Sequence, residues 1–559
     1  MREARESFIA SAQDRSAGAT RPAPRQPDSA PRSAPRHWPR AARVAPPMWP
    51  ASVRLRLLAA ALVLTLPAGC SLFESEGTRL PLQLVTRACA GTPPLEGATH
   101  LRLRVTGEGM APLERLVPVG SPPEALEGVP PGPARVLEVR AYQNRPEEGG
   151  RVVALGRTAP FDVAGGAAPS QRVVVRRVNA FTPVSDVEHP ETCGALAAPR
   201  AGHSATLLQD GRVLVAGGFA LQAGARVALS SAELYAPDTG TLSAAPDLGS
   251  ARAFHSASLL PSGSVLLAGG ENAAGPLADA LRVDLAQGGV ASFPLERARS
   301  QHAAAVDSAG HVLLAGGVGE GGGVVAPAEA RVQDGAAAAP VAVPLPRLGA
   351  SALRTPGDGL AVVGGSDGSA LVQDVVLLRF GAAGFESAGP PARLLQGRRA
   401  AAVAPWAGGA SALVLGGFDT PTESPTTQRA LATSELVALT PGARATPGPN
   451  VGARADACAV ALPDGRVLAA GGRTGEPGTL PQSSDAAELI VPPAADASTP
   501  LPVVLGLARL EAGRWAHTCT LLADGTVLVV GGLKEAPGEV GVVREVLGDV
   551  LVFTPAPVD

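Results

Sequence analysis

The chain has 559 residues, of which 17% are charged and 3% aromatic, and its formal net charge is −3. This length is greater than one ordinary domain needs, so we expect more than one domain. The charge balance argues against a binding surface for nucleic acid, because such a surface needs an excess of basic side chains.

The first 47 residues are rich in Arg, Pro, Ala and Ser and have no apolar periodicity. We expect residues 1–47 to be a disordered or untranslated extension, with Met48 as the true start. Residues 48–69 carry basic side chains and then an apolar run from Leu57 to Leu66. This run is too short to span a bilayer and is typical of an export signal.

The export signal ends in Pro-Ala-Gly-Cys, which resembles a bacterial lipobox. The resemblance implies that Cys70 is the lipid attachment site and the mature N-terminus, and that residues 70–77 are a tether. It also implies a lipid-anchored location in the bacterial cell envelope, at the outer membrane or cell surface, with the membrane as a partner through the anchor. The alternative is an ordinary cleaved signal whose cysteine is incidental.

Residues 78–185 contain short alternating or apolar segments, such as THLRLRVTG and QRVVVRRVNAF, separated by Pro and Gly turns. About seven such strands over roughly 100 residues predict a small immunoglobulin-like β-sandwich. We expect this domain to be a spacer between the membrane and the rest of the chain.

From residue 186 to residue 559 the chain repeats one pattern, an Arg followed 17 residues later by a Gly-Gly pair. The pattern occurs seven times with a period of 47 to 60 residues, which is typical of propellers and other repeat arrays. The repeated arginines are Arg200, Arg252, Arg299, Arg347, Arg399, Arg454 and Arg514.

Each repeat holds two apolar runs joined by a turn such as Asp-Gly, which predicts a hairpin. A variable loop follows, then a third strand that opens on an acidic residue, and then a short fourth strand. The acidic residues are Glu233, Asp279, Glu329, Asp374, Glu435, Glu488 and Asp549. One acid per Arg predicts a structural ring of ion pairs rather than a site for an anionic ligand.

The repeat resembles the Kelch repeat of bacterial Kelch proteins and of the central domain of galactose oxidase. The resemblance rests on Arg-x-x-His, as at Arg200 and His203, on the Asp-Gly turn, on the Gly-Gly pair and on Glu-Leu-Tyr-x-Pro at 233–237. It implies that residues 186–559 form a seven-bladed Kelch-like β-propeller, which makes the whole chain all-β. Because the chain ends after the third strand of the last unit, we expect residues 191–199 to supply its fourth strand and close the ring.

Four cysteines remain once Cys70 is assigned to the lipid, and exported proteins mature where disulfides form. Cys89 and Cys193 are one possible pair, which would join the sandwich to the propeller. Cys458 and Cys519 lie in the first strands of the last two units and are a second possible pair, although packed sheets usually stand too far apart for a disulfide. Because no CxxC or HxxxH spacing occurs, we expect no metal site.

Copper radical oxidases related to galactose oxidase need two Tyr ligands, one of them cross-linked to Cys, and two His. The chain has only Tyr142, in the expected sandwich, and Tyr235, in the repeat motif, so we expect no such activity. No catalytic residue and no cofactor is predicted.

These observations favour a binding or scaffolding protein that is not an enzyme and whose partner is an unknown protein or carbohydrate. The loops that follow the Gly-Gly pair are longest in units 5, 6, 7 and 1, and we expect the partner to bind on this arc. One alternative is a propeller enzyme that acts on carbohydrate, by analogy of fold alone. The other is a purely structural envelope protein.

Overall fold

The computed structural model describes residues 77–166, 168–424, 427–479, 482–493, 502–507, 509–538 and 541–558. These residues belong to the second of two compact units, Phe73–Asp559. The expected N-terminal extension, the export signal and Cys70 lie outside the described residues. No helix among the described residues is long and apolar enough to cross a membrane.

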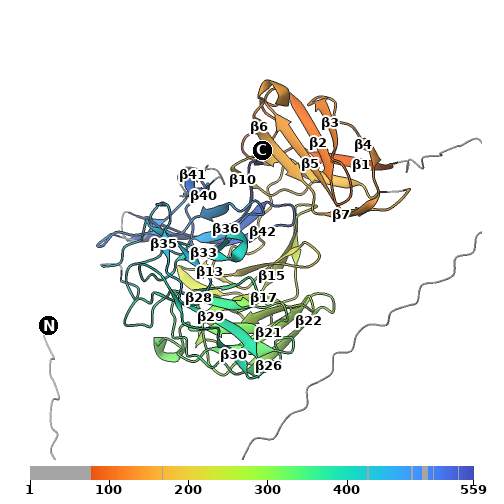
Figure 1. Cartoon of the computed structure of the whole chain (residues 1–559). Helices are drawn as coiled ribbons and strands as arrows, with labels where there is room; N and C mark the ends of the chain where they lie inside the picture. Colours follow the sequence, from red (N-terminus) through yellow and green to blue (C-terminus); the bar gives the residue numbers. More distant parts are fainter. Residues whose placement is uncertain are drawn as a thin grey trace, which may run out of the picture. The chain divides into compact units, whose positions relative to one another are not determined.

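The described chain is all-β, which confirms the coarse fold prediction (Figure 1). Its helical elements are three single turns of 3-10 helix, η1 (Pro146–Glu148), η2 (Glu320–Gly322) and η3 (Ala407–Gly409).

Two sheets form the region that precedes the repeats. One has the strand order β4 (Ala125–Val129), β1 (Thr78–Val85), β8 (Gln171–Val174), with β1 and β8 parallel. The other has the order β3 (Leu113–Pro118), β2 (His100–Thr106), β5 (Gly132–Tyr142), β6 (Val152–Arg157), β9 (Arg176–Arg177), and β7 (Phe161–Val163) also pairs with β5.

The two sheets share one apolar core. Along β2 the side chains alternate between half-buried and buried, so that Leu101, Leu103 and Val105 face inwards. Leu80 of β1 and Val173 of β8 pack from the other sheet into the same core. This alternation is what a sheet with one covered face requires, and it places residues 78–177 in a two-layer unit.

The repeats form seven antiparallel sheets, which we number in chain order as repeat sheets 1 to 7. Repeat sheet 1 has the strands β11 (Ser204–Leu207), β12 (Val213–Ala216), β15 (Ala232–Ala236) and β16 (Thr241–Ala244). Repeat sheet 2 has the strands β17 (Ser256–Leu259), β18 (Val265–Ala268), β21 (Asp279–Asp284) and β22 (Gly289–Pro294). Repeat sheet 3 has the strands β23 (Ala303–Val306), β24 (Val312–Ala315), β25 (Glu329–Val332) and β26 (Ala337–Ala339).

The remaining four repeat sheets follow the same order of strands. Repeat sheet 4 has the strands β27 (Ser351–Arg354), β28 (Leu360–Val363), β29 (Asp374–Gly381), β30 (Gly384–Ser387) and, also on β29, β31 (Ala392–Arg393). Repeat sheet 5 has the strands β32 (Ala402–Trp406), β33 (Ser411–Leu415), β34 (Ser434–Ala438) and β35 (Thr446–Pro447). Repeat sheet 6 has the strands β36 (Cys458–Ala461), β37 (Val467–Ala470), β40 (Ala487–Val491) and β41 (Val503–Gly506). Repeat sheet 7 has the strands β42 (Thr518–Leu521), β43 (Val527–Pro537), β44 (Val542–Thr554) and β10 (Ala180–Pro183).

Short hairpins extend the loops of three repeats. They are β13 (Phe219–Gln222) with β14 (Ala225–Ala228), β19 (Glu271–Asn272) with β20 (Gly275–Pro276), and β38 (Arg473–Thr474) with β39 (Gln482–Ser483).

The first strands of the seven repeat sheets contact one another around a closed cycle. Each first strand touches the first strand of the next sheet, from β11 to β42, and β42 touches β11 again. Neighbouring sheets share apolar cores. Tyr235 and Val213 of repeat sheet 1, for example, pack with Leu528 and Val552 of repeat sheet 7. The second strands are therefore covered on both faces, which explains their unbroken apolar runs.

The Gly-Gly pair is required by both backbone conformation and space. Gly217 and Gly218 have φ angles of 61° and 95°, a left-handed region that favours glycine. A Cβ atom on Gly217 would lie 2.5 Å from the carbonyl oxygen of Arg252 in the next repeat. Each pair thus allows one repeat to pack closely on the next.

The strand that completes repeat sheet 7 is not the expected one. β10 pairs antiparallel with β44, with Phe181 opposite Phe553, and so takes the outermost place. Within the expected segment 191–199, Cys193 and Ala195 make only isolated bridges, to Ser185 and Asp549. The closing strand therefore lies before residue 186, where we expected the repeat region to begin. The reason is that β44 continues to Thr554 and offers its free edge to the earlier segment.

Candidate functional site

The repeated arginine holds each repeat together from inside. The side chain of Arg200 is fully buried, and its Nη2 lies 2.7 Å from Glu233 Oε1. Its Nη1 donates a hydrogen bond of 2.8 Å to the carbonyl of Gly217. The same pairing joins Arg252 to Asp279, Arg299 to Glu329, Arg454 to Glu488 and Arg514 to Asp549. These side chains are occupied by structural contacts.

Two of the seven expected arginines differ. In repeat 5 the ring position belongs to Arg398 rather than Arg399, because Arg398 Nη2 lies 2.5 Å from Glu435 Oε1 and Nη1 donates to the carbonyl of Gly416. This repeat has one additional residue between the ring Arg and the Gly-Gly pair, which moves the position by one. In repeat 4, Arg347 donates to the carbonyl of Pro346, while Asp374 pairs with Arg393 at 3.2 Å.

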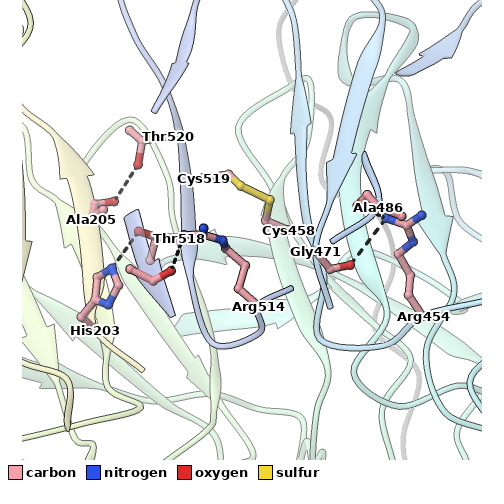
Figure 2. Close-up of a disulfide and its surroundings, with 11 residues drawn as sticks. His203, Ala205, Arg454, Cys458, Gly471, Ala486, Arg514, Thr518, Cys519 and Thr520 are labelled. Carbon is pink, nitrogen blue, oxygen red and sulfur yellow. Dashed lines mark hydrogen bonds between the residues drawn. A yellow bond between two sulfur atoms is a disulfide. The ribbon is translucent and has the colours of Figure 1, made fainter. Parts of the chain in front are cut away.

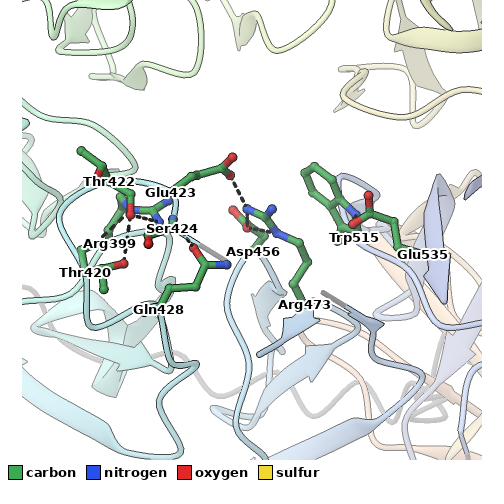
Figure 3. Close-up of polar contacts among 10 residues, drawn as sticks. All are labelled: Arg399, Thr420, Thr422, Glu423, Ser424, Gln428, Asp456, Arg473, Trp515 and Glu535. Carbon is green, nitrogen blue, oxygen red and sulfur yellow. Dashed lines mark hydrogen bonds and ion pairs between the residues drawn. The ribbon is translucent and has the colours of Figure 1, made fainter. Parts of the chain in front are cut away.

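Arg399 lies instead in a polar cluster that ties the long loops together (Figure 3). Its Nε donates to the carbonyl of Thr420 and its Nη2 to that of Thr422. Arg473 Nη2 lies 2.9 Å from Glu423 and 2.5 Å from Asp456. We call the contacts of Arg473 with Glu423, Asp456 and Trp515 the loop clamp.

The loop clamp links repeats 5, 6 and 7. The guanidinium carbon of Arg473 lies 4.2 Å from the centre of the Trp515 ring, and Trp515 Nε1 donates to Glu535 Oε2 at 2.9 Å. Arg226 of repeat 1 also stacks over the Trp515 ring, at 5.9 Å. Contacts through Arg473 and Trp515 thus connect the long loops of repeats 5, 6, 7 and 1.

Four histidines occupy equivalent positions three residues after a ring Arg. In three of them Nε2 makes a hydrogen bond to the hydroxyl that opens the first strand of the preceding sheet. The pairs are His203 with Thr518 at 3.0 Å, His255 with Ser204 at 2.9 Å and His302 with Ser256 at 2.8 Å. Burial lowers the pKa of each of these histidines to about 3, so they are neutral at pH 7.

His517 is the exception, because the residue that opens the preceding first strand is Cys458. Both ring nitrogens of His517 are buried and make no hydrogen bond. Burial, assisted by Arg514, lowers the pKa of His517 to about 3, and the nearby backbone of Ala470 opposes this only in part. His517 is therefore a neutral imidazole whose lone pair is not engaged by a hydroxyl.

Two sulfur atoms lie beside this imidazole. Cys458 and Cys519 form a disulfide between β36 and β42, with Cα atoms 5.9 Å apart (Figure 2). The two sulfurs and a ring nitrogen of His517 all lie within 4.8 Å of one another. Among the residues that the structure describes, no other set of three His, Cys, Asp or Glu side chains has this arrangement. We call Cys458, His517 and Cys519 the Cys-His-Cys group.

The other possible pair of cysteines is also joined. Cys89 and Cys193 form a disulfide with Cα atoms 5.1 Å apart. The distance argument against the Cys458–Cys519 pair failed because β36 and β42 are in contact here, with the two Cα atoms 5.9 Å apart, closer than the ~10 Å usual between packed sheets.

Sequence reasoning missed the Cys-His-Cys group because its members are far apart in the chain, with Cys458 and Cys519 separated by 61 positions. One signal was available. In the other repeats the position of Cys458 is Ser, Thr or Ala, and that of Cys519 is Ala or Val. Both cysteines replace non-sulfur residues at a single interface between neighbouring sheets.

Comparison with known proteins gives matches among solved structures, but none among family models or curated proteins. One similar solved structure is a fungal alcohol oxidase of the AA5 family in complex with copper. It is 18% identical, the match covers 65% of this chain and 76% of that chain, and the TM-score is 0.50. At this identity the likeness concerns the fold.

These findings correct the functional prediction. The structural neighbour is a copper oxidase, and the Cys-His-Cys group could hold a metal ion. They contradict the expectations of a binding or scaffolding protein, of a chain that is not an enzyme and of disfavoured copper oxidase activity. The two tyrosines do not meet at the group. Tyr142 lies in β5, and Tyr235 is buried between repeat sheets 7 and 1.

Proposed function

We propose that the protein is a copper-dependent oxidoreductase built on a closed seven-bladed propeller of the Kelch type. The cycle of contacts among the first strands and the likeness to a copper alcohol oxidase support this proposal. We place the reacting centre at the Cys-His-Cys group, where repeat sheets 6 and 7 meet.

The observation that carries the proposal is the free imidazole of His517 beside two sulfurs. Thiolate and imidazole are the ligand types that suit copper(I), and they also suit zinc. The His517 nitrogen lies within 4.8 Å of both sulfurs, but the sulfurs are joined to each other as a disulfide. The disulfide must therefore be reduced before both sulfurs can bind one ion as thiolates. When bound, copper supplies one-electron redox chemistry.

The chain's own residues supply the remaining features of such a centre. His517 is held neutral by burial and by Arg514, so its nitrogen lone pair is available at pH 7 without loss of a proton. Gly471 leaves room for the ring, because a Cβ atom there would lie 2.5 Å from His517 Cε1. Arg514 is fixed by Asp549 and therefore keeps its charge close to the imidazole.

The substrates that we propose are compounds with primary alcohol groups, including carbohydrates. The test is to reduce the purified full chain, load it with copper and measure oxygen consumption and peroxide with a panel of alcohols and sugars. Turnover should require copper and should be lost in His517→Gln. The matched control is His203→Gln, which alters an equivalent imidazole next to a hydroxyl rather than sulfur. Turnover that persists in His517→Gln would exclude this centre.

We also propose that the protein is exported and attached to the bacterial cell envelope through a lipid on Cys70, with an immunoglobulin-like sandwich as its spacer. The apolar run, the Pro-Ala-Gly-Cys sequence and the two-layer unit support this proposal. Cys70→Ser should move the protein from the membrane fraction to the soluble fraction. A variant that stays with the membrane at unchanged mobility would contradict it.

A further inference from the structure

We infer that the Cys458–Cys519 disulfide and a bound metal ion are alternative states of one site, so that reduction of the disulfide opens the site to a soft metal ion. This inference rests on the proposed function, because it concerns the same three side chains. It makes the redox state of two cysteines the switch for metal binding.

The repeats show what the site lacks when the disulfide is closed. At the other three equivalent positions a hydroxyl group satisfies the buried Nε2, as Ser204 does for His255. Cys458 takes the place of that hydroxyl, but in the disulfide its sulfur carries no hydrogen to donate. His517 is accordingly the one of the four imidazoles with no hydrogen bond to either ring nitrogen. The closed state thus leaves a buried nitrogen unpaired.

Both sulfurs are departures from the repeat at this interface. The position of Cys519 holds an alanine in five of the other repeats, such as Ala205 and Ala459, and a valine in the remaining one. The repeat fold therefore does not need a sulfur here. Cys519 lies directly after Thr518, whose hydroxyl is hydrogen-bonded to His203 of repeat sheet 1. The same strand therefore places a hydroxyl beside His203 and the Cys519 sulfur beside His517 of its own repeat.

The chemistry balances with an external dithiol as the reductant. The dithiol is oxidised to its disulfide, the Cys458–Cys519 bond breaks, and each sulfur gains one electron and one proton. Metal binding then replaces the two thiol protons, which are released to solvent, and the metal joins both sulfurs and a nitrogen of His517. No ligand is available from the sulfurs before reduction, because a metal requires the thiolate.

The site therefore responds to its surroundings. In an oxidising compartment it closes as a disulfide, and it takes up metal only where a dithiol reductant reaches β36 and β42. The second disulfide, Cys89–Cys193, has no histidine within the same spacing among the described residues. It should not respond to metal and serves as an internal reference.

The experiment compares oxidised and reduced full-length protein, with copper(I) delivered from a chromophoric chelator as the probe. Bound copper and the alkylation of each cysteine by iodoacetamide are measured, the latter by peptide mass spectrometry. The reduced protein should bind about one copper ion per chain, and the oxidised protein none. Copper should protect Cys458 and Cys519 from alkylation but should leave Cys89 and Cys193 reactive once these are reduced.

Variants separate the ligands from the fold. His517→Gln and Cys458→Ser should each abolish protection by copper, whereas His203→Gln should retain it. Equal copper binding by the oxidised and reduced proteins would overturn the inference, and so would absence of binding by reduced protein that remains folded by circular dichroism. If copper binds only after reduction but no alcohol is oxidised, the switch stands and the proposed enzymatic function fails.

Discussion

Arg398 and Arg399 are neighbours in sequence but have different roles. Arg398 is buried against Glu435 and two backbone carbonyls, while Arg399 reaches into the loop region. Counting residues backwards from the Gly-Gly pair selects Arg399, because the other repeats have one residue fewer. A better guide is the left-handed residue two positions after the ring Arg, which is Ala400 in this repeat. That backbone feature is not visible in residue types alone.

The two arginines offer a matched test. Arg398→Ala leaves the carboxylate of Glu435 buried without its partner, so we expect a loss of about 3–5 kcal/mol in the free energy of unfolding. Arg399→Ala removes hydrogen bonds to two loop carbonyls and should cost about 1–2 kcal/mol. Denaturant unfolding of both variants measures the difference. Equal losses would mean that the assignment of the ring position is wrong.

The four histidines that follow a ring Arg make the stability depend on pH. Their pKa in the folded protein is about 3, lower than the ordinary value of 6.5 that we take for the unfolded chain. As the pH falls below about 6.5, the unfolded chain therefore binds protons that the folded chain does not. The stability present at pH 7 is therefore lost progressively as the pH falls from about 6.5 towards 3.

His203→Gln removes one of these titrating groups. Unfolding free energies measured from pH 6 to pH 4 should fall less steeply in this variant, by about 1.4 kcal/mol per pH unit. A slope identical to that of the unaltered protein would show that His203 is already protonated in the folded state.

At the scale of single elements, the loop clamp holds the long loops of repeats 5 and 6 in place. Arg473 is buried and contacts carboxylates from two repeats and an indole from a third. Arg429 and Glu476 also link two of these loops, at 3.4 Å, but both side chains are more than half exposed. Because Arg473 is buried, we expect its contacts to contribute more to loop stability than the solvent-exposed Arg429–Glu476 ion pair.

Arg473→Ala should therefore loosen the loops at 418–424 and 473–479, while the strands stay intact. Hydrogen exchange of the loop amides should become faster, and Arg429→Ala should leave these rates nearly unchanged. Similar protection in Arg473→Ala and the unaltered protein would contradict the role of the clamp.

β10 is the outermost strand of repeat sheet 7, a role that the sequence analysis did not predict. Phe181 packs on Phe553 with ring centres 5.2 Å apart and contacts the core between repeat sheets 6 and 7. Phe181→Ala should cost about 2–3 kcal/mol, somewhat less than for a fully buried ring. Glu191→Ala, in the segment first expected to close the ring, should be neutral. A larger loss of stability in Glu191→Ala than in Phe181→Ala would instead support residues 191–199 as the closing strand.

At the scale of the whole molecule, features that depend on local sequence could be predicted, whereas features that depend on contacts between distant residues could not. The hairpin turns and unbroken apolar runs indicated seven repeats because the first three strands of each repeat sheet come from one short stretch of the chain, and the described residues form seven repeat sheets. The closing strand depends on where β44 ends, and the Cys-His-Cys group depends on two sheets meeting. Neither depends on residues that are close in the chain, so no local periodicity reports them.

The central claim is that Cys458, His517 and Cys519 together hold copper, and X-ray absorption of the reduced, copper-loaded protein tests it most directly. We expect both sulfur and imidazole nitrogen among the atoms bound to copper. His517→Gln should lose the imidazole signal and Cys519→Ser part of the sulfur signal. A spectrum that contains only nitrogen and oxygen neighbours would contradict the claim.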